Sequence, residues 1–242
     1  MTEMEQINPD FSAFPPGGAA VVIGAQGGVG LALVAALQEV PVFANVVGFS
    51  RHGAVPVDIV VEATVAAAAQ TLAGQEVRLV IDATGFLHGD GFMPEKSFKE
   101  LSAAHLARSF AVNALGPALL MKHFLPLLPR QGRAVFATLS ARVGSIGDNQ
   151  IGGWYSYRAA KAALNQLVHT AAIEVKRSKP EVVCVALHPG TVDSRLSSPF
   201  AKSGLNVRPP HEAAKDLLVV ISRLEPLQSG GFFDYRGEMV VW

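Results

Sequence analysis

The chain alternates between short apolar runs rich in β-branched residues and longer segments rich in alanine and leucine. The short runs are apolar throughout, which is typical of strands covered on both faces. In the longer segment 155–177, apolar residues recur three and four positions apart and form one stripe, as on a helix. The pattern predicts strands at 19–23, 45–49, 54–57, 78–83, 133–139, 181–187 and 231–234. It predicts helices at 28–40, 62–73, 98–128, 155–177 and 210–224.

This order of strands and helices predicts an α/β fold with a doubly wound parallel sheet and helices on both faces, because right-handed crossovers place them there. Pro117 and Pro126 should mark bends or ends of the long helical stretch. Residues 1–18 read as a flexible N-terminal leader and 19–242 as a single domain that includes the substrate site. The irregular stretch 194–209 is either a surface loop or a lid.

Composition narrows the possible classes of protein. Hydrophobic residues make up 50% and charged residues 17% of the 242 positions, so a large core is expected and disorder is not. The formal net charge is zero, which gives no long-range attraction to nucleic acid or an anionic membrane. Cys184 is the single cysteine, so neither an intramolecular disulfide nor a thiolate metal cluster can form.

Targeting signals and metal sites are also not expected. Residues 1–16 lack the basic segment and apolar run of a signal peptide, and the other apolar runs are short. A cytoplasmic protein with no membrane span is the plain interpretation. The seven histidines lack the spacing of metal ligands, so no metal is predicted.

A glycine-rich turn, GAQGGVG at 24–30, follows the first predicted strand and opens the first predicted helix. Gly24, Gly28 and Gly30 permit a tight turn and keep side chains away from a phosphate that faces the N–H groups of the helix end. At the first strand–helix turn of such a sheet, the motif predicts a dinucleotide-binding Rossmann fold, with Gln26 and Val29 also at the cofactor. A purely structural turn is the alternative.

The end of the second strand indicates which cofactor binds. NAD-binding proteins usually carry an acid there, but this chain has Ser50, Arg51 and His52. Arg51 could pair with a 2′-phosphate and stack on adenine, whereas a carboxylate would repel that phosphate. The sequence therefore favours NADP(H), with NAD(H) still possible and a solvated loop arginine as the alternative role.

Tyr157 and Lys161 lie four residues apart, on one face of the predicted helix. A phenol has a pKa near ~10 and is a poor acid or base at neutral pH. A nearby ammonium stabilises the phenolate, and this lowers the pKa of the phenol towards the pH at which the protein works. Taken alone, the pair is better read as an ordinary exposed Tyr–Lys pair, because the pattern is common by chance.

The G-x-x-x-G-x-G turn, the Tyr-x-x-x-Lys pair after the strand 133–139 and the Pro189-Gly190 turn together resemble the short-chain dehydrogenase/reductase family over residues 19–242. The resemblance implies that Tyr157 is the acid/base and that Lys161 sustains its phenolate and holds the cofactor ribose. It implies that Ser140 polarises the substrate oxygen, with Ser145 as the rival. Asn113 would shape a helix kink and support a water path to the lysine.

The resemblance also assigns further cofactor contacts. Asp58 matches the acid that accepts from the adenine amino group, although a turn role is the alternative. The contacts expected near the adenosine ribose and the nicotinamide are Ala83, Thr84, Gly85, Pro189, Gly190, Thr191 and Val192. The chain departs from the family where Ile23 replaces a threonine, and at Asp82 and Thr84 within the usual Asn-Asn-Ala-Gly turn.

Four segments look like the C-factor/carbonyl-reductase branch of this family: PEKS at 94–97, RSFAVN at 108–113, GGWYSYR at 152–158 and GFFDY at 231–235. The branch includes reductases and proteins of cell–cell signalling. It implies an NADP(H)-dependent oxidoreductase acting on a small carbonyl or alcohol substrate. The alternative is a nucleotide-binding signalling protein with weak or no catalysis. The family also implies a homodimer or homotetramer paired through 98–128 and 156–177, and a substrate chosen by the loops 141–154 and 194–209.

Overall fold

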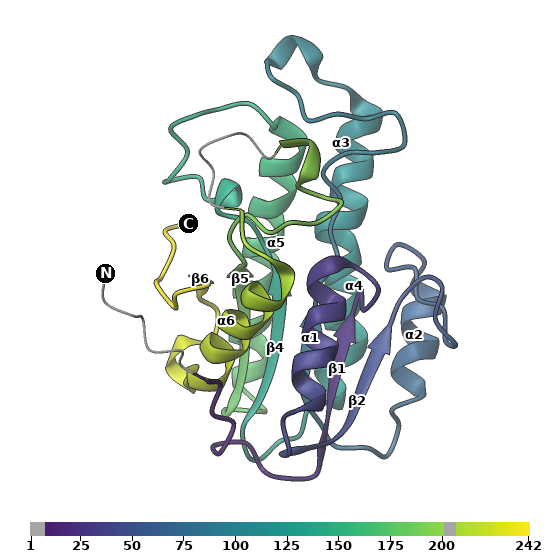
Figure 1. The fold of residues 1–242 in the computed structure, drawn as a ribbon, viewed down its shortest axis with the longest axis vertical. Coiled ribbons are helices and arrows are strands. Elements are labelled where there is room, and N and C mark those ends of the chain that lie inside the picture. Colours follow the sequence, from purple (N-terminus) through teal and green to yellow (C-terminus); the bar gives the residue numbers. More distant parts are fainter. Residues whose placement is uncertain (1–7, 201–206) are drawn as a thin grey trace.

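The computed structural model describes residues 8–200 and 207–242, and six parallel strands form its central sheet (Figure 1). Their order across the sheet is β2-β1-β3-β4-β5-β6. The strands are β1 (Gly18–Ile23), β2 (Phe43–Phe49), β3 (Val77–Asp82), β4 (Ala134–Leu139), β5 (Val182–His188) and β6 (Phe232–Asp234). The chain runs from β1 outward to β2 and then returns to place β3 on the other side of β1. The α/β doubly wound prediction is thus confirmed.

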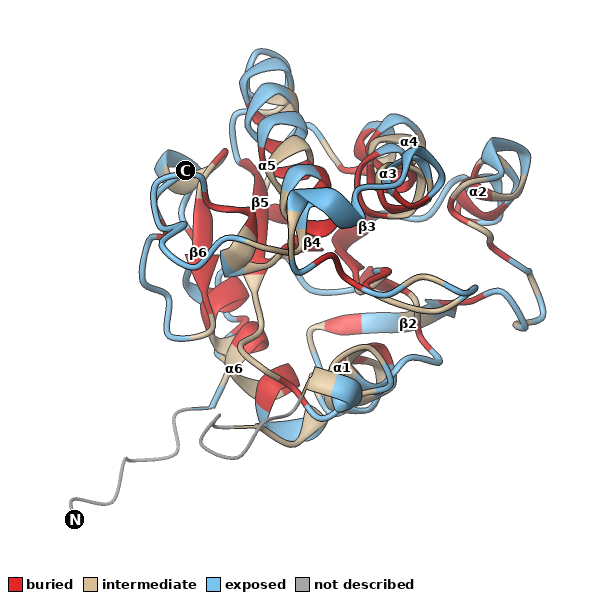
Figure 2. Cartoon of the chain, turned by 90° about the horizontal axis from the view of Figure 1, so that it is seen from above, coloured by how far each residue is buried: buried red, intermediate tan, exposed pale blue. Residues whose placement is uncertain are grey.

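Helices cover both faces of the sheet, so the buried residues lie along the strands between two helical layers (Figure 2). One layer holds α1 (Gly28–Gln38) and α6 (Pro210–Arg223), which pack against each other. The other layer holds α2 (Glu62–Gln70), α3 (Ala103–Phe110), α4 (Gly116–Phe124) and α5 (Tyr155–Lys176). β1, β3 and β4 are buried along their whole length, which explains their continuous apolar runs, whereas the edge strand β2 has exposed positions.

The segment 54–57 is not a strand, contrary to the prediction. Only an isolated bridge between Ser50 and Pro56 joins it to the end of β2. Pro56 has no N–H to donate to a strand ladder, and a short apolar run is weak evidence for a strand when a proline interrupts it.

The stretch predicted as one helix at 98–128 is divided by its prolines. A π-helical turn at Ala111–Leu115 separates α3 from α4, and 3₁₀ turns occupy Phe98–Glu100 and Leu125–Leu127. The ring of Pro117 conflicts with the carbonyl four residues earlier, that of Asn113, and a widened turn relieves this conflict. The helical run Ala103–Leu127 is long and apolar enough to cross a membrane by length and composition only, although the sequence predicted only short apolar runs.

The N-terminal segment also differs from the loose leader expected at residues 1–18. Phe11 and Phe14 are buried and pack edge to face on each other and on Phe43 of β2. They join the core beneath α1 and α6, so this part of the segment is a structural element. Residues 1–7 lie outside the described residues. So do 201–206 of the irregular stretch 194–209, whose described part includes a 3₁₀ turn at Ser198–Phe200.

Candidate active site

A cavity of about 1180 Å³ opens at the carboxyl ends of the strands. It lies between β1 and β3, where the order in which successive strands are added to the sheet reverses. Ligands of open α/β sheets bind in this crevice because neighbouring loops diverge there. Every residue predicted to contact the cofactor lines the cavity except Gly30, which lies behind the turn.

Glycine at 24 and 30 is required by the turn itself. Gly24 has φ +83°, and a Cβ on it would lie 3.0 Å from the carbonyl oxygen of Ala83. A Cβ on Gly30 would lie 2.1 Å from the carbonyl oxygen of Gly24, so no side chain fits. These two residues bring the chain from β1 directly into α1.

Gly28 has a different reason to be glycine. A Cβ on it would meet nothing closer than Ser194, at 3.5 Å, so the protein itself leaves room for a side chain. Gly28 faces the cavity at the start of α1, and no side chain caps this helix end. A cradle that a Cβ would fill, beside uncapped N–H groups at the positive end of a helix, fits a phosphate group.

Tyr157 and Lys161 lie in the first two turns of α5, are buried and line the cavity. The Lys161 Nζ donates to the carbonyl oxygen of Leu139, at 2.7 Å, and lies 5.8 Å from the centre of the Tyr157 ring. Burial lowers the pKa of Lys161 to about 8, although the negative charge of Asp82 acts in the opposite direction. Burial raises the pKa of the Tyr157 phenol, so the phenol is protonated in this arrangement.

Ser140 follows β4 and lines the same cavity. The hydroxyl donates to Asn165 Oδ1 at 2.6 Å, while the Asn165 amide nitrogen faces the carbonyl oxygen of Gly144 at 3.5 Å. The rival Ser145 is buried, does not line the cavity, and accepts from the backbone N–H of Asp148. The geometry therefore brings Ser140, and not Ser145, to the wall that holds Tyr157 and Lys161.

Comparison with known proteins gives a consistent result. Residues 17–212 match the family described as enoyl-(acyl carrier protein) reductase. A 1-hydroxy-2-glutathionyl-2-methyl-3-butene dehydrogenase of Rhodococcus is 33% identical over 77% of this chain and 78% of its own. The C-signal protein of Myxococcus xanthus is 38% identical over 59% of this chain and 82% of its own. The chain belongs to the short-chain dehydrogenase/reductase family.

Solved structures of carbonyl reductases share the fold. The NADPH-bound carbonyl reductase from chicken fatty liver superposes with a TM-score of 0.81 and 23% identity, covering 96% of this chain and 97% of its own. The carbonyl reductase Sniffer of Drosophila melanogaster superposes with a TM-score of 0.78 and 23% identity, covering 94% of this chain and 100% of its own. At these identities the likeness shows the fold alone.

Asp82, which differs from the residue usual in the family, forms hydrogen bonds that hold the turn after β3. Asp82 is buried, and its carboxylate accepts from the backbone N–H and hydroxyl of Thr84, at 3.0 and 2.6 Å. Its other oxygen accepts from the Thr138 hydroxyl at 2.7 Å, across from β3 to β4. Burial raises the pKa of the Asp82 carboxyl, while these hydrogen bonds and the charge of Lys161 lower it. The two departures from the family, Asp82 and Thr84, thus bond to each other and hold the turn after β3.

Asn113 lies in the π turn, is buried and does not line the cavity. Its side chain accepts from the N–H of Phe86 at 2.9 Å and donates to the carbonyl oxygen of Phe86 at 2.7 Å. A third bond joins its amide nitrogen to Ser109 Oγ. Asn113 therefore joins the loop after β3 to the kinked helix.

Arg51 and Asp58 both line the cavity at the end of β2. Arg51 is exposed and forms no ion pair with a described residue. Asp58 accepts from the N–H of Val60 at 3.1 Å, so it also performs the turn role that the sequence left open.

Sequence reasoning missed several residues of this site. Asn165 lies one helical turn beyond Lys161 and thus on the same face, a signal that could have revealed it. Phe86, Arg108, Leu196 and Phe200 line the cavity from loops and α3, and no local pattern marks them.

Proposed function

We propose that this member of the family is an NADP(H)-dependent oxidoreductase that reduces the carbonyl group of a small molecule to an alcohol. One observation carries the proposal. Tyr157, Ser140 and Lys161 line the same cavity as the uncapped, glycine-rich start of α1. A proton donor, a polar group and a phosphate cradle are therefore in one space, as reduction by a dinucleotide requires.

The cofactor assignment rests on two features. The pyrophosphate fits the start of α1 beside Gly28, and the exposed Arg51 stands where a 2′-phosphate needs a cation. Related structures with bound NADPH or NADP, from chicken liver and Burkholderia multivorans, support this choice. When bound, the reduced nicotinamide supplies the hydride.

Tyr157 supplies the proton in this proposal. Carbonyl reduction needs a protonated donor in the ground state, and the buried phenol is protonated because its pKa is raised. The oxygen that forms on the substrate carbon is far more basic than a phenolate, so transfer from Tyr157 is favourable. The Lys161 ammonium, buried beside the ring, stabilises the phenolate that remains until solvent returns a proton.

Ser140 assists after a change of hydrogen bond. Its only proton is directed to Asn165, so at rest the Ser140 hydroxyl has no proton to donate to a substrate oxygen. Rotation of the hydroxyl from Asn165 to the substrate oxygen would polarise the carbonyl. Asn165 then acts as the partner that holds the hydroxyl between turnovers.

A panel of aldehydes and ketones, assayed with NADPH and NADH, tests the proposal. Removing the phenolic hydroxyl with Tyr157→Phe should lower kcat by about 10²–10⁴-fold, because the proton donor is lost. NADPH binding, followed by fluorescence titration, should change less than about threefold. Turnover that persists unchanged in this variant would contradict the role of Tyr157, and failure of NADPH to bind would contradict the cofactor.

A signalling role is the second candidate, favoured by the 38% identity to the C-signal protein. In that case NADPH would bind, no carbonyl compound would be turned over, and Tyr157→Phe would leave the activity in a signalling assay intact. The same panel therefore separates the two functions.

We also propose that the protein forms a homodimer or homotetramer through α3, α4 and α5. These helices, with the π turn between α3 and α4, expose Leu106, Leu115, Leu167 and Ile173. Light scattering of the protein should give two or four times the 25.5 kDa of one chain. A single-chain mass at all concentrations would contradict this pairing.

A further inference from the structure

The turn that leads into α5 has an unusual backbone. Gly152, Gly153 and Trp154 all have positive φ, at 69°, 66° and 53°. Among the described residues, Trp154 is one of two non-glycine residues with positive φ. A tryptophan in this left-handed conformation is strained because its Cβ approaches the following carbonyl. Such strain persists only where the surroundings enforce it, and it often marks a ligand site.

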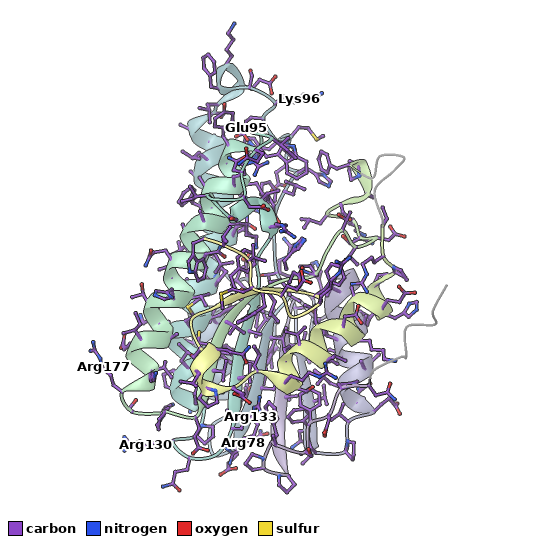
Figure 3. All side chains as sticks on the ribbon, turned by 90° about the vertical axis from the view of Figure 1, so that its left-hand side faces the viewer. Arg78, Glu95, Lys96, Arg130, Arg133 and Arg177 are labelled. Carbon is purple, nitrogen blue, oxygen red and sulfur yellow. The ribbon has the colours of Figure 1, made fainter. Side chains whose placement is uncertain are left out.

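Glu95 enforces the turn from one side. Its backbone oxygen accepts from the N–H of Trp154 at 2.5 Å. Its carboxylate, with the residue only 2% exposed, accepts from the N–H and hydroxyl of Ser156 and lies 3.0 Å from His105 Nδ1. Trp154 offers no side-chain cap, so Glu95 caps the start of α5 in its place. Glu95 lies at the end of the molecule opposite Arg78 and Arg133 (Figure 3).

Arg158 enforces the turn from the other side. Its guanidinium donates to the carbonyl oxygens of Gly153 and Gly152, at 2.9 and 3.1 Å. A third bond, at 3.2 Å, reaches the carbonyl oxygen of Val143 in the loop after β4. The backbone around Trp154 is therefore held through the two preceding glycines, through Ser156 and through its own N–H.

This backbone places the Trp154 indole in a row of rings along the cavity. Its centre lies 6.3 Å from that of Tyr157 and 5.2 Å from that of Phe200, and both contacts are edge to face. Phe200 in turn lies 5.4 Å from the His88 ring. His88 Nε2 lies 2.9 Å from the carbonyl oxygen of Arg195, which joins the loop after β3 to the loop after β5. The ring row thus comes from three separate segments and begins at Tyr157.

We propose that Trp154, Phe200 and His88, here called the aromatic wall, select a substrate with a flat aryl group attached to the reacting carbonyl. The inference rests on the proposed carbonyl reduction and adds its substrate class. All three side chains line the cavity that holds Tyr157, and Phe86, Leu87 and Leu196 add apolar surface to it. An aryl ring packs against aromatic neighbours with favourable edge-to-face geometry that a saturated ring of similar size cannot adopt.

Two methyl ketones of nearly equal size test the aromatic wall: acetophenone, with a flat ring, and cyclohexyl methyl ketone, with a saturated one. The wild-type protein should reduce acetophenone with a kcat/KM about tenfold higher. Trp154→Leu and Phe200→Leu should each lower this value for acetophenone about tenfold and for the cyclohexyl ketone less than threefold. Trp242→Leu, which removes the other tryptophan away from the cavity, should change neither.

The outcomes separate the inference from the function on which it rests. Equal losses on both ketones, or a wild-type preference for the saturated ring, would overturn the aromatic wall while leaving carbonyl reduction intact. If neither ketone is turned over, the proposed reduction fails for this substrate pair. Calorimetric Kd values for the two ketones, measured with NADP⁺ present, then decide the inference by the same tenfold ratio. Phe200→Leu keeps the test valid if Trp154→Leu does not fold, because Phe200 is only partly buried.

Discussion

The two sides of the cavity are built in different ways. The side proposed to hold the cofactor, here called the cofactor side, consists of main chain and glycine at the ends of β1, β2 and β3, directly continuous with the sheet. The side proposed to hold the substrate, here called the substrate side, consists of large side chains, such as Trp154, Phe200 and Arg108, carried mainly by loops. Sheet register fixes the first side, because parallel strands end together at one edge. The second side depends on contacts between loops that are distant in sequence.

This contrast predicts different sensitivities. On the cofactor side, the addition of one carbon atom to a glycine should weaken cofactor binding, because the backbone there is expected to lie close to the cofactor. On the substrate side, the loss of a ring should change selectivity more than folding. Substitutions within the glycine-rich turn test the first half of the comparison most strongly.

Gly28→Ala and Gly30→Ala should separate binding from folding. A Cβ at 28 has room within the protein but fills the cradle, so we expect NADPH binding to weaken about hundredfold (about 2.7 kcal/mol) with little change in unfolding. A Cβ at 30 collides with the carbonyl oxygen of Gly24, so we expect the free energy of unfolding to fall by about 1–3 kcal/mol. Urea unfolding and fluorescence titration measure the two effects.

The two variants serve as controls for each other. Gly28→Ala protein that binds NADPH as tightly as the wild type would contradict a pyrophosphate at the start of α1. A loss of stability in Gly28→Ala equal to that in Gly30→Ala would show that both glycines serve only the turn.

Arg51→Ala tests the selection of NADP(H), with a smaller expected effect. Loss of the guanidinium should weaken NADPH binding about tenfold and NADH binding less than twofold, since only NADPH carries the 2′-phosphate. Arg130→Ala removes the same charge from the segment before β4, near Arg78 and Arg133 in Figure 3 and away from the cavity, and should change neither affinity. Equal losses for both cofactors in Arg51→Ala would contradict the assignment.

Particular residues show how much could be predicted from the sequence. The strand–helix order, the turn at Gly24–Gly30 and the pair Tyr157 and Lys161 are local patterns, and the structure brings them to one cavity. Long-range packing explains the misses. Phe11 and Phe14 become core residues only because β2 places Phe43 beside them. Likewise, the carboxylate of Glu95 caps a helix that begins sixty residues later, and no local sequence pattern predicts that contact.

Asp82→Asn tests whether a buried carboxylate at the end of β3 acts on Lys161, and it is expected to change the rate least of these variants. The negative charge of Asp82 raises the pKa of Lys161, which burial holds at about 8. The proposed mechanism needs the ammonium, so the rate should fall as pH rises through that pKa. Asparagine removes the charge with little change in shape, so the pKa of Lys161 should fall and the alkaline limb of the kcat profile should move down by about half a pH unit, roughly threefold in rate on that limb. Asp58→Asn, the same change at an acid on the cofactor side, should leave the limb in place. An unshifted limb in Asp82→Asn would mean that the buried carboxyl is already neutral and that hydrogen bonding to Thr84 and Thr138 is its whole role.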